Sequence, residues 1–196
     1  MNLPNKLTMM RVVLVPVFMI FAAVSHYGTA DFHAAYMLIA GVIFAIASIT
    51  DFLDGYLARK NHLVTDFGKF MDPLADKFLV ISACLGIIVK FDYIRPVFVW
   101  ASAIVIFREF AVTSLRMVAA NKAGLVIAAA WLGKVKTTTQ MICIICVLLE
   151  PVILPFKPFT EWHILSYVTT AVMVVMTLWS GIDYLIAYKP YIGETK

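Results

Sequence analysis

Four aspartates stand inside two apolar stretches of the sequence. Asp51 and Asp54 are three residues apart, and Asp72 and Asp76 are four residues apart, so on helices each pair would share one face. A charged side chain inside a membrane span costs at least ~2.5–3.5 kcal/mol, and four clustered carboxylates cannot all stay ionised without cations. Hard oxygen ligands select Mg²⁺, Mn²⁺ or Ca²⁺, so the four acids predict a site for two divalent metal ions. The alternative is a set of separate salt bridges, for which the neighbouring bases are Arg59, Lys69 and Lys77.

The segments that must position these acids are long and apolar. Of 196 residues, 62% are hydrophobic and only 14% are charged, whereas a soluble domain carries about 25% charged residues. A bilayer core needs about 20 mostly apolar residues per helix, and the apolar stretches are too continuous for the alternating pattern of a β-barrel. The sequence therefore predicts an all-α membrane bundle of six transmembrane helices, in a single domain over residues 1–196. The predicted spans are Leu7–Val24, Ala34–Ala58, Phe67–Val89, Pro96–Met117, Lys134–Leu149 and His163–Tyr188.

The second and third predicted spans would bring the two acid pairs to a similar depth. Their connecting turn lies near Leu63, and Asp54 and Asp72 are each nine residues from it. Asp51 and Asp76 are twelve and thirteen residues away. In an antiparallel hairpin with a rise of ~1.5 Å per residue, all four carboxylates would lie at most roughly 14–20 Å from the turn. We therefore expect the site a few turns below one membrane interface, open to water through a polar cleft.

The basic residues indicate which way the bundle faces. With the N-terminus inside, ten lysines and arginines fall on the cytoplasmic side and three on the outer side, and such an excess is typical of cytoplasmic loops. Both termini and the opening of the acid site are therefore expected in the cytoplasm. The net charge of +4 suits contact with anionic lipid headgroups, whereas the scattered bases form no face for nucleic acid.

Small residues accompany the acids. Gly55 and Ala58 lie on the acid-bearing face of the second span, and Gly68 lies one turn before Asp72. Small side chains at these positions would let a ligand approach the backbone. The alternative is close packing of one membrane helix on another, which also favours small residues.

The acids and small residues together resemble a known signature. The segments Asp51–Arg59 and Gly68–Asp76, separated by eight residues, fit D-x-x-D-G-x-x-A-R…G-x-x-x-D-x-x-x-D at every fixed position. This pattern resembles the signature of the CDP-alcohol phosphotransferase family. The resemblance implies a six-helix membrane enzyme, usually a homodimer, that binds two Mg²⁺ or Mn²⁺ ions. In such an enzyme an alcohol attacks the β-phosphorus of a CDP-linked donor.

The same resemblance implies roles for individual residues. Asp51, Asp54 and Asp72 would be shared metal ligands, and Asp76 would complete the site of the second ion. Asp76 also suits a general base that takes the proton from the attacking hydroxyl. The residues implied to lie beside the donor's nucleotide are Gly55, Ala58, Arg59, Asp66 and Gly68.

Stretches outside the signature indicate the acceptor. Asn2–Arg11, Arg108–Arg116, Gly133–Thr137 and Trp179–Tyr184 resemble the corresponding parts of the family's bacterial phosphatidylglycerophosphate synthase subgroup. That resemblance implies transfer of a phosphatidyl group from CDP-diacylglycerol to sn-glycerol 3-phosphate. It also implies a multi-pass protein of the bacterial plasma membrane.

Four basic side chains fit a phosphorylated acceptor. Arg108 lies inside the fourth predicted span, and Arg116 shares its face two turns on. Lys134 and Lys136 open the fifth span on the same side. A phosphate dianion is bound best by several cations, so these residues are candidate ligands of glycerol 3-phosphate. Three alternatives stay open: the bases are only cytoplasmic anchors, the acceptor is another alcohol such as inositol phosphate, or the acids belong to a divalent-cation transporter.

Overall fold

The computed structural model describes residues 2–24, 30–60, 65–123, 131–154, 159 and 161–192. Every predicted span is a helix, and most helices extend a few residues beyond the predicted bounds, so the prediction of an all-α bundle is confirmed. The helices are α1 Leu3–Val24, α2 Ala30–Lys60, α3 Asp66–Lys90, α4 Arg95–Ala123, α5 Trp131–Ile153 and α7 Ile164–Ile192.

Five of these helices could cross a membrane by length and composition. They are α1, α2, α4, α5 and α7, so the chain is a multi-pass membrane protein. The helix α3 has 25 residues, which is long enough, but Asp72, Asp76 and Lys77 interrupt its apolar stretch. Of the six described helices, α3 is therefore the one that does not meet the composition of a membrane span.

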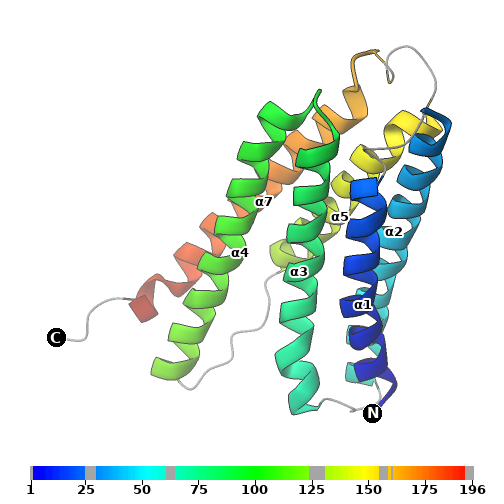
Figure 1. Cartoon of the computed structure of the whole chain (residues 1–196). Coiled ribbons are helices and arrows are strands. Elements are labelled where there is room, and N and C mark those ends of the chain that lie inside the picture. Colours follow the sequence, from blue (N-terminus) through cyan, green and yellow to red (C-terminus); the bar gives the residue numbers. More distant parts are fainter. Residues whose placement is uncertain are drawn as a thin grey trace.

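The helices run alternately up and down the bundle, and α1 begins at the same end as α7 finishes (Figure 1). The helix α1 packs on α2 and α3, while α7 packs on α4 and α5. Contacts of α2 with α5, and of α3 with α4 and α5, join these two groups. This arrangement puts α3 and α5 beside each other, where each contacts helices of both groups.

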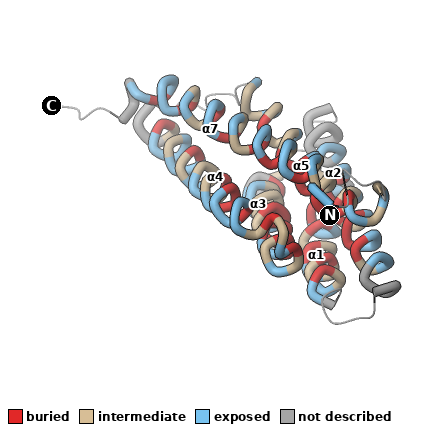
Figure 2. The backbone as a smooth tube through the Cα atoms, turned by 90° about the horizontal axis from the view of Figure 1, so that it is seen from above, coloured by how far each residue is buried: buried red, intermediate tan, exposed pale blue. Residues whose placement is uncertain are grey.

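Apolar side chains cover the outside of the bundle as well as filling its inside. Figure 2 shows buried residues facing inward and exposed residues on the outward faces of the helices. Phe52, Trp100 and Phe107 are each more than 70% exposed, which in water would promote association. A hydrocarbon surrounding explains these faces. The largest buried apolar side chains include Phe18, Phe44, Leu79, Ile87 and Phe98.

The start of α3 is fastened to the first turns of α1. Thr65 is the N-cap of α3, and its hydroxyl accepts a hydrogen bond of 3.0 Å from the Gly68 amide. The same hydroxyl donates to Asn5 Oδ1 at 3.0 Å. N-cap side chains satisfy amides that have no partner within the helix, so this contact sets both the beginning of α3 and its register against α1.

Candidate active site

The helix α1 holds one carboxylate from each acid-bearing helix. Arg11 is fully buried, and its Nη1 lies 2.7 Å from Asp51 Oδ1 of α2. Thr8 donates a hydrogen bond of 2.7 Å to Asp72 Oδ1 of α3. Because Thr8 and Arg11 are three residues apart, they lie on one face of α1. The first helix therefore lies across α2 and α3 and fixes the positions of both acids.

Asp76 lies one turn further along α3 and faces the interior of the bundle. Its Oδ1 atom is buried and has no hydrogen-bond partner among the described residues. The charged groups that act on this carboxylate are Asp51, Glu109, Lys136 and Arg11. Asp76 thus stands between the acids held by α1 and a second charged cluster on α4 and α5.

Part of the predicted site lies outside what the structure describes. The backbone of α2 is helical through Asp54, Gly55, Ala58 and Arg59, and α3 begins at Asp66, but the side chains of these five residues are outside the described part. Among the described residues, no three His, Cys, Asp and Glu side chains are grouped to hold a metal ion. The four-aspartate site includes Asp54, so it stays a prediction, and so do the nucleotide contacts of these residues.

Gly68 has a packing reason to be small. It is buried, and a Cβ atom there would lie 3.2 Å from Asn5 Oδ1 and 3.3 Å from Thr65 Oγ1. Both distances are tight for a carbon atom, so a larger residue would force the Asn5 and Thr65 side chains, which join α1 to α3, to shift. Helix packing, the alternative named above for the small residues, therefore applies to Gly68, and its predicted contact with the nucleotide stays a prediction.

A second charged cluster joins α4, α5 and α7. Glu109 of α4 pairs with Lys136 of α5, and its Oε1 lies 3.5 Å from Arg108 Nη1. Arg108 Nη2 donates to Ser180 Oγ of α7 at 2.6 Å, and the guanidinium carbon lies 5.3 Å from the centre of the Tyr184 ring. Arg108 Nε is buried without a partner in the described ranges. Both cations of the cluster are therefore held by the protein, and Arg108 keeps a buried donor for a ligand.

Only two of the four predicted phosphate ligands meet. Arg108 and Lys136 share Glu109, but Arg116 and Lys134 have exposed side chains. Within the described part of the chain, no ion pair joins Arg116 or Lys134 to the cluster. The geometry favours Arg108 and Lys136 as the anion-binding pair and leaves the other two bases at the surface.

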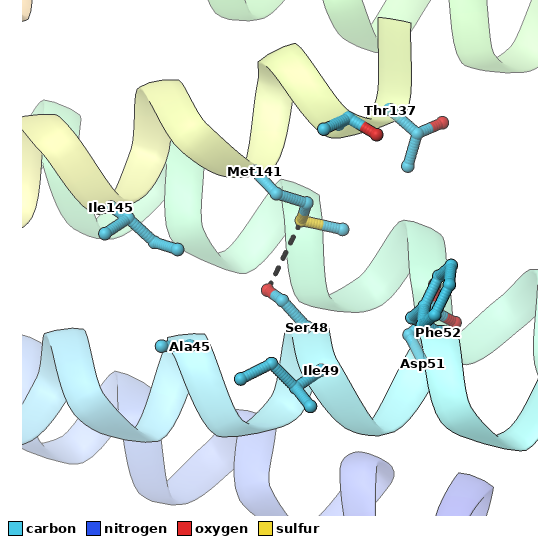
Figure 3. Close-up of a pocket in the computed structure, with 9 residues that line it drawn as sticks. Ala45, Ser48, Ile49, Asp51, Phe52, Thr137, Met141 and Ile145 are labelled. Atoms are coloured by element: carbon cyan, nitrogen blue, oxygen red, sulfur yellow. Dashed lines mark hydrogen bonds between the residues drawn. The ribbon is translucent and has the colours of Figure 1, made fainter. Parts of the chain in front are cut away.

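A groove between α2 and α5 reaches the acid end. Its volume is about 320 Å³, and Figure 3 shows Asp51 and Thr137 toward one end and Ala45 and Ile145 toward the other. The hydroxyl of Ser48 donates a hydrogen bond of 3.4 Å to the Met141 sulfur across the middle of the groove. The groove therefore passes from an apolar stretch to a carboxylate. Its lining residues are Ala45, Ser48, Ile49, Asp51, Phe52, Thr137, Thr138, Met141 and Ile145.

The sequence analysis assigned no role to several residues of these clusters. Arg11 and Glu109 carried a usable signal, because both are charged residues within long apolar stretches. Thr8 and Ser180 carried no such signal, because hydroxyl residues are common in membrane helices. Their contacts depend on which helices pack together.

The fold and the charged clusters together define a polytopic membrane protein that gathers acids and bases inside one helical bundle. Comparison with known proteins identifies its family. Residues 1–179 match the sequence profile of the CDP-alcohol phosphatidyltransferase family. The chain belongs to this family, as the aspartate signature indicated.

Several relatives are similar over nearly the whole length. A CDP-diacylglycerol–glycerol-3-phosphate 3-phosphatidyltransferase of Bacillus subtilis is 44% identical, over 93% of each chain. A probable phosphatidylglycerophosphate synthase of Mycobacterium tuberculosis is 38% identical, over 94% of this chain and 80% of that protein. A further CDP-diacylglycerol–glycerol-3-phosphate 3-phosphatidyltransferase, from Salmonella paratyphi A, is 37% identical over 96% of this chain and 95% of its own. Membership of an enzyme family favours a transferase over a cation transporter.

Proposed function

We propose that this chain transfers the phosphatidyl group of CDP-diacylglycerol to sn-glycerol 3-phosphate, giving phosphatidylglycerophosphate and CMP. The observation that carries the proposal is the 44% identity over 93% of the chain with a Bacillus subtilis protein named for that reaction. The complete aspartate signature and the paired cations Arg108 and Lys136 support it independently, because the reaction needs a diphosphate site and a phosphate site.

The donor fits the groove between α2 and α5. An acyl chain can lie against its apolar stretch, beside Ile49 and Ile145, and the headgroup then reaches Asp51 at the polar end. The rest of the lipid stays in the bilayer against the apolar outer faces of the helices. This placement needs no enclosed lipid cavity.

The acids have the chemistry to hold two divalent metal ions. Carboxylate oxygens are the ligands that Mg²⁺ and Mn²⁺ prefer, and the buried Asp76 Oδ1, unpartnered among the described residues, has a free acceptor for a cation. When bound, such ions neutralise the donor diphosphate and the charge that grows on the leaving CMP. The residues that would hold them are Asp51, Asp54, Asp72 and Asp76.

The chain's own residues then orient the acceptor and move its proton. Arg108 and Lys136 bind the phosphate of glycerol 3-phosphate, and Glu109 keeps both cations in place before it enters. Asp76 accepts the proton of the 1-hydroxyl. The hydroxyl oxygen forms a bond to the phosphorus that carries diacylglycerol, and the bond from that phosphorus to the CMP oxygen breaks. Arg11 holds Asp51 during these steps.

The proposal includes a location and an assembly. The helix α3 would be a sixth span, both termini would lie in the cytoplasm and the site would open there, in the plasma membrane of a bacterium. The excess of lysine and arginine on that side and the common end of α1 and α7 (Figure 1) support this orientation. The single domain of residues 1–196 would act as a homodimer, which the family resemblance implies.

An acceptor panel tests the proposed function. Purified protein in lipid nanodiscs receives CDP-diacylglycerol, Mg²⁺ and one of glycerol 3-phosphate, inositol phosphate, glycerol or serine. We expect CMP release only with glycerol 3-phosphate, with one phosphatidylglycerophosphate formed per CMP. CMP release with a different acceptor would show that the proposed substrate is wrong. Mg²⁺ flux into liposomes without CMP release would show that the protein is a transporter and not a transferase.

A further inference from the structure

Gln140 of α5 is a buried amide with no assigned role. Its side chain has no solvent exposure, and neither its Nε2 nor its Oε1 has a hydrogen-bond partner among the described residues. Buried polar groups in folded proteins nearly always have a partner. In a bundle surrounded by hydrocarbon, leaving both ends of an amide unpaired is especially costly. A ligand that both donates and accepts a hydrogen bond would satisfy both ends of the amide.

Gln140 lies just deeper in the bundle than the charged clusters. It lies four residues after Lys136 and so on the same face of α5, one turn deeper. The adjacent residue Met141 contacts Ser48, which is one turn deeper than Asp51 on α2. Two helices thus place Gln140 about one turn below the level of the acids and bases.

Two other buried atoms without a described partner belong to the same site. They are Asp76 Oδ1 on α3 and Arg108 Nε on α4. Lys136, one turn from Gln140, lies close to both, because it shares Glu109 with Arg108 and its charge interacts with that of Asp76. An acid, a base and an amide on three neighbouring helices therefore each keep a hydrogen-bonding atom for a ligand.

We propose that Gln140 binds the 2-hydroxyl of the acceptor and so selects a vicinal diol phosphate. This inference rests on the proposed function. Arg108 and Lys136 account for the phosphate and Asp76 for the 1-hydroxyl, which leaves the 2-hydroxyl as the one polar group of glycerol 3-phosphate without a protein partner. A hydroxyl both donates and accepts, and a neutral amide does the same. The four residues from Lys136 to Gln140 correspond to a rise of ~6 Å along α5, a separation that suits contacts to a phosphate on C3 and to the hydroxyl on the adjacent C2.

Two acceptors and two variants test this assignment. The acceptors are glycerol 3-phosphate and 3-hydroxypropyl phosphate, which lacks only the 2-hydroxyl. The variants are Gln140→Met, which keeps the length of the side chain and removes the amide, and Thr170→Val as a matched control. Thr170 is also buried and polar, but it contacts Cys143 and lies away from the charged clusters. The measured quantity is kcat/KM for each acceptor, from CMP release.

We expect the wild-type protein to prefer glycerol 3-phosphate by ~10- to 100-fold, because the analogue without the 2-hydroxyl leaves the buried amide unsatisfied. Gln140→Met should bring that ratio close to one, mainly by lowering kcat/KM for glycerol 3-phosphate. Thr170→Val should leave the ratio unchanged. If Gln140 only braces the helices, Gln140→Met will lower both activities equally and keep the ratio, and that result overturns the inference.

The inference and the proposed function fail in different ways. A wild-type protein that releases no CMP with glycerol 3-phosphate, yet does so with another alcohol, refutes the proposed acceptor and this inference with it. A wild-type protein that uses glycerol 3-phosphate but does not distinguish it from 3-hydroxypropyl phosphate refutes the role of Gln140 alone.

Discussion

A buried carboxylate, Glu150, and a half-buried one, Asp76, lie toward opposite ends of the bundle and differ in what surrounds them. Glu150, near the end of α5, accepts hydrogen bonds from Leu165 N at 3.0 Å and Ser166 N at 2.8 Å, and from the Ser166 hydroxyl. Asp76, on α3, keeps a buried oxygen without a hydrogen bond from any described residue. One acid is satisfied by its own chain, and the other is not.

The network around Glu150 continues beyond its first partners. The Tyr93 hydroxyl oxygen lies 3.1 Å from Ser166 Oγ. Because the Ser166 hydroxyl donates its hydrogen to Glu150, the Tyr93 hydroxyl donates the hydrogen bond to Ser166. Burial raises the pKa of Tyr93 to about 12, so the phenol keeps its proton at physiological pH. Tyr167 in turn donates to the Tyr93 carbonyl at 2.7 Å. Glu150 thus caps the first turn of α7 in a closed network that ties the α3–α4 loop to α5 and α7.

The difference separates structural acids from functional ones. A carboxylate whose lone pairs are filled by backbone amides has little left to offer a ligand, and its loss exposes buried donors. A carboxylate left partly unsatisfied costs stability and is kept where a ligand or a proton completes it. We therefore expect acid-to-amide changes at the two ends to have opposite signatures in activity and stability.

The largest effect is expected from Asp72→Asn. The change keeps the size of the side chain and an oxygen that can accept from Thr8, so the fold should persist. It removes a charge where cations are expected to bind, and several kcal/mol of lost transition-state stabilisation correspond to at least ~10³-fold in turnover. CMP release and thermal unfolding on the same preparation measure both. Near-normal turnover with unchanged metal dependence would remove Asp72 from the site.

Asp76→Asn should be nearly as damaging, and in a particular way. A general base acts in the transition state, so kcat should fall ~10²- to 10⁴-fold while KM for CDP-diacylglycerol changes little. Steady-state kinetics with the donor varied at saturating acceptor separate the two parameters. A change confined to donor KM would make Asp76 a plain ligand and move the base elsewhere.

Arg108→Lys tests the pair of cations Arg108 and Lys136, and its expected effect on activity is of intermediate size. The forked guanidinium reaches Ser180 and Glu109 together, and an ammonium group cannot reproduce that geometry. We expect KM for glycerol 3-phosphate to rise ~10-fold or more, with the donor KM unchanged. If Arg108 only joins the helices, the variant will melt earlier while its acceptor KM stays at the wild-type value.

The smallest effect on activity is expected from Glu150→Gln. The amide group would face backbone donors, so the variant should be about 1–3 kcal/mol less stable, which lowers Tm by several degrees. Its kcat/KM should stay within ~3-fold of wild type, as expected for a site remote from the chemistry. An Asp76→Asn variant that loses stability but not activity, beside a Glu150→Gln variant that does the reverse, would invert the comparison between the two acids.

Much of this protein can be predicted from its sequence, for identifiable reasons. Helices in a bilayer must be long and apolar throughout, so the five segments that form α1, α2, α4, α5 and α7 were recognisable one at a time. The spacing of Asp51, Asp54, Asp72 and Asp76 is likewise a property of two neighbouring segments. The charged residues Asp72, Asp76 and Lys77 were equally visible in the sequence of the third segment. They are the reason why, among the described helices, α3 alone lacks a fully apolar span.

Only the tertiary structure decided which side chains meet. Thr8 reaches Asp72 across 64 positions of sequence, and Arg11 reaches Asp51 because α1 packs on both α2 and α3. Glu109 joins Lys136 to Arg108, whereas Arg116 and Lys134 remain exposed. Hydrophobicity and spacing belong to single segments and were readable in advance. A hydrogen bond or ion pair belongs to two segments, and its partner depends on how the helices turn their faces toward one another.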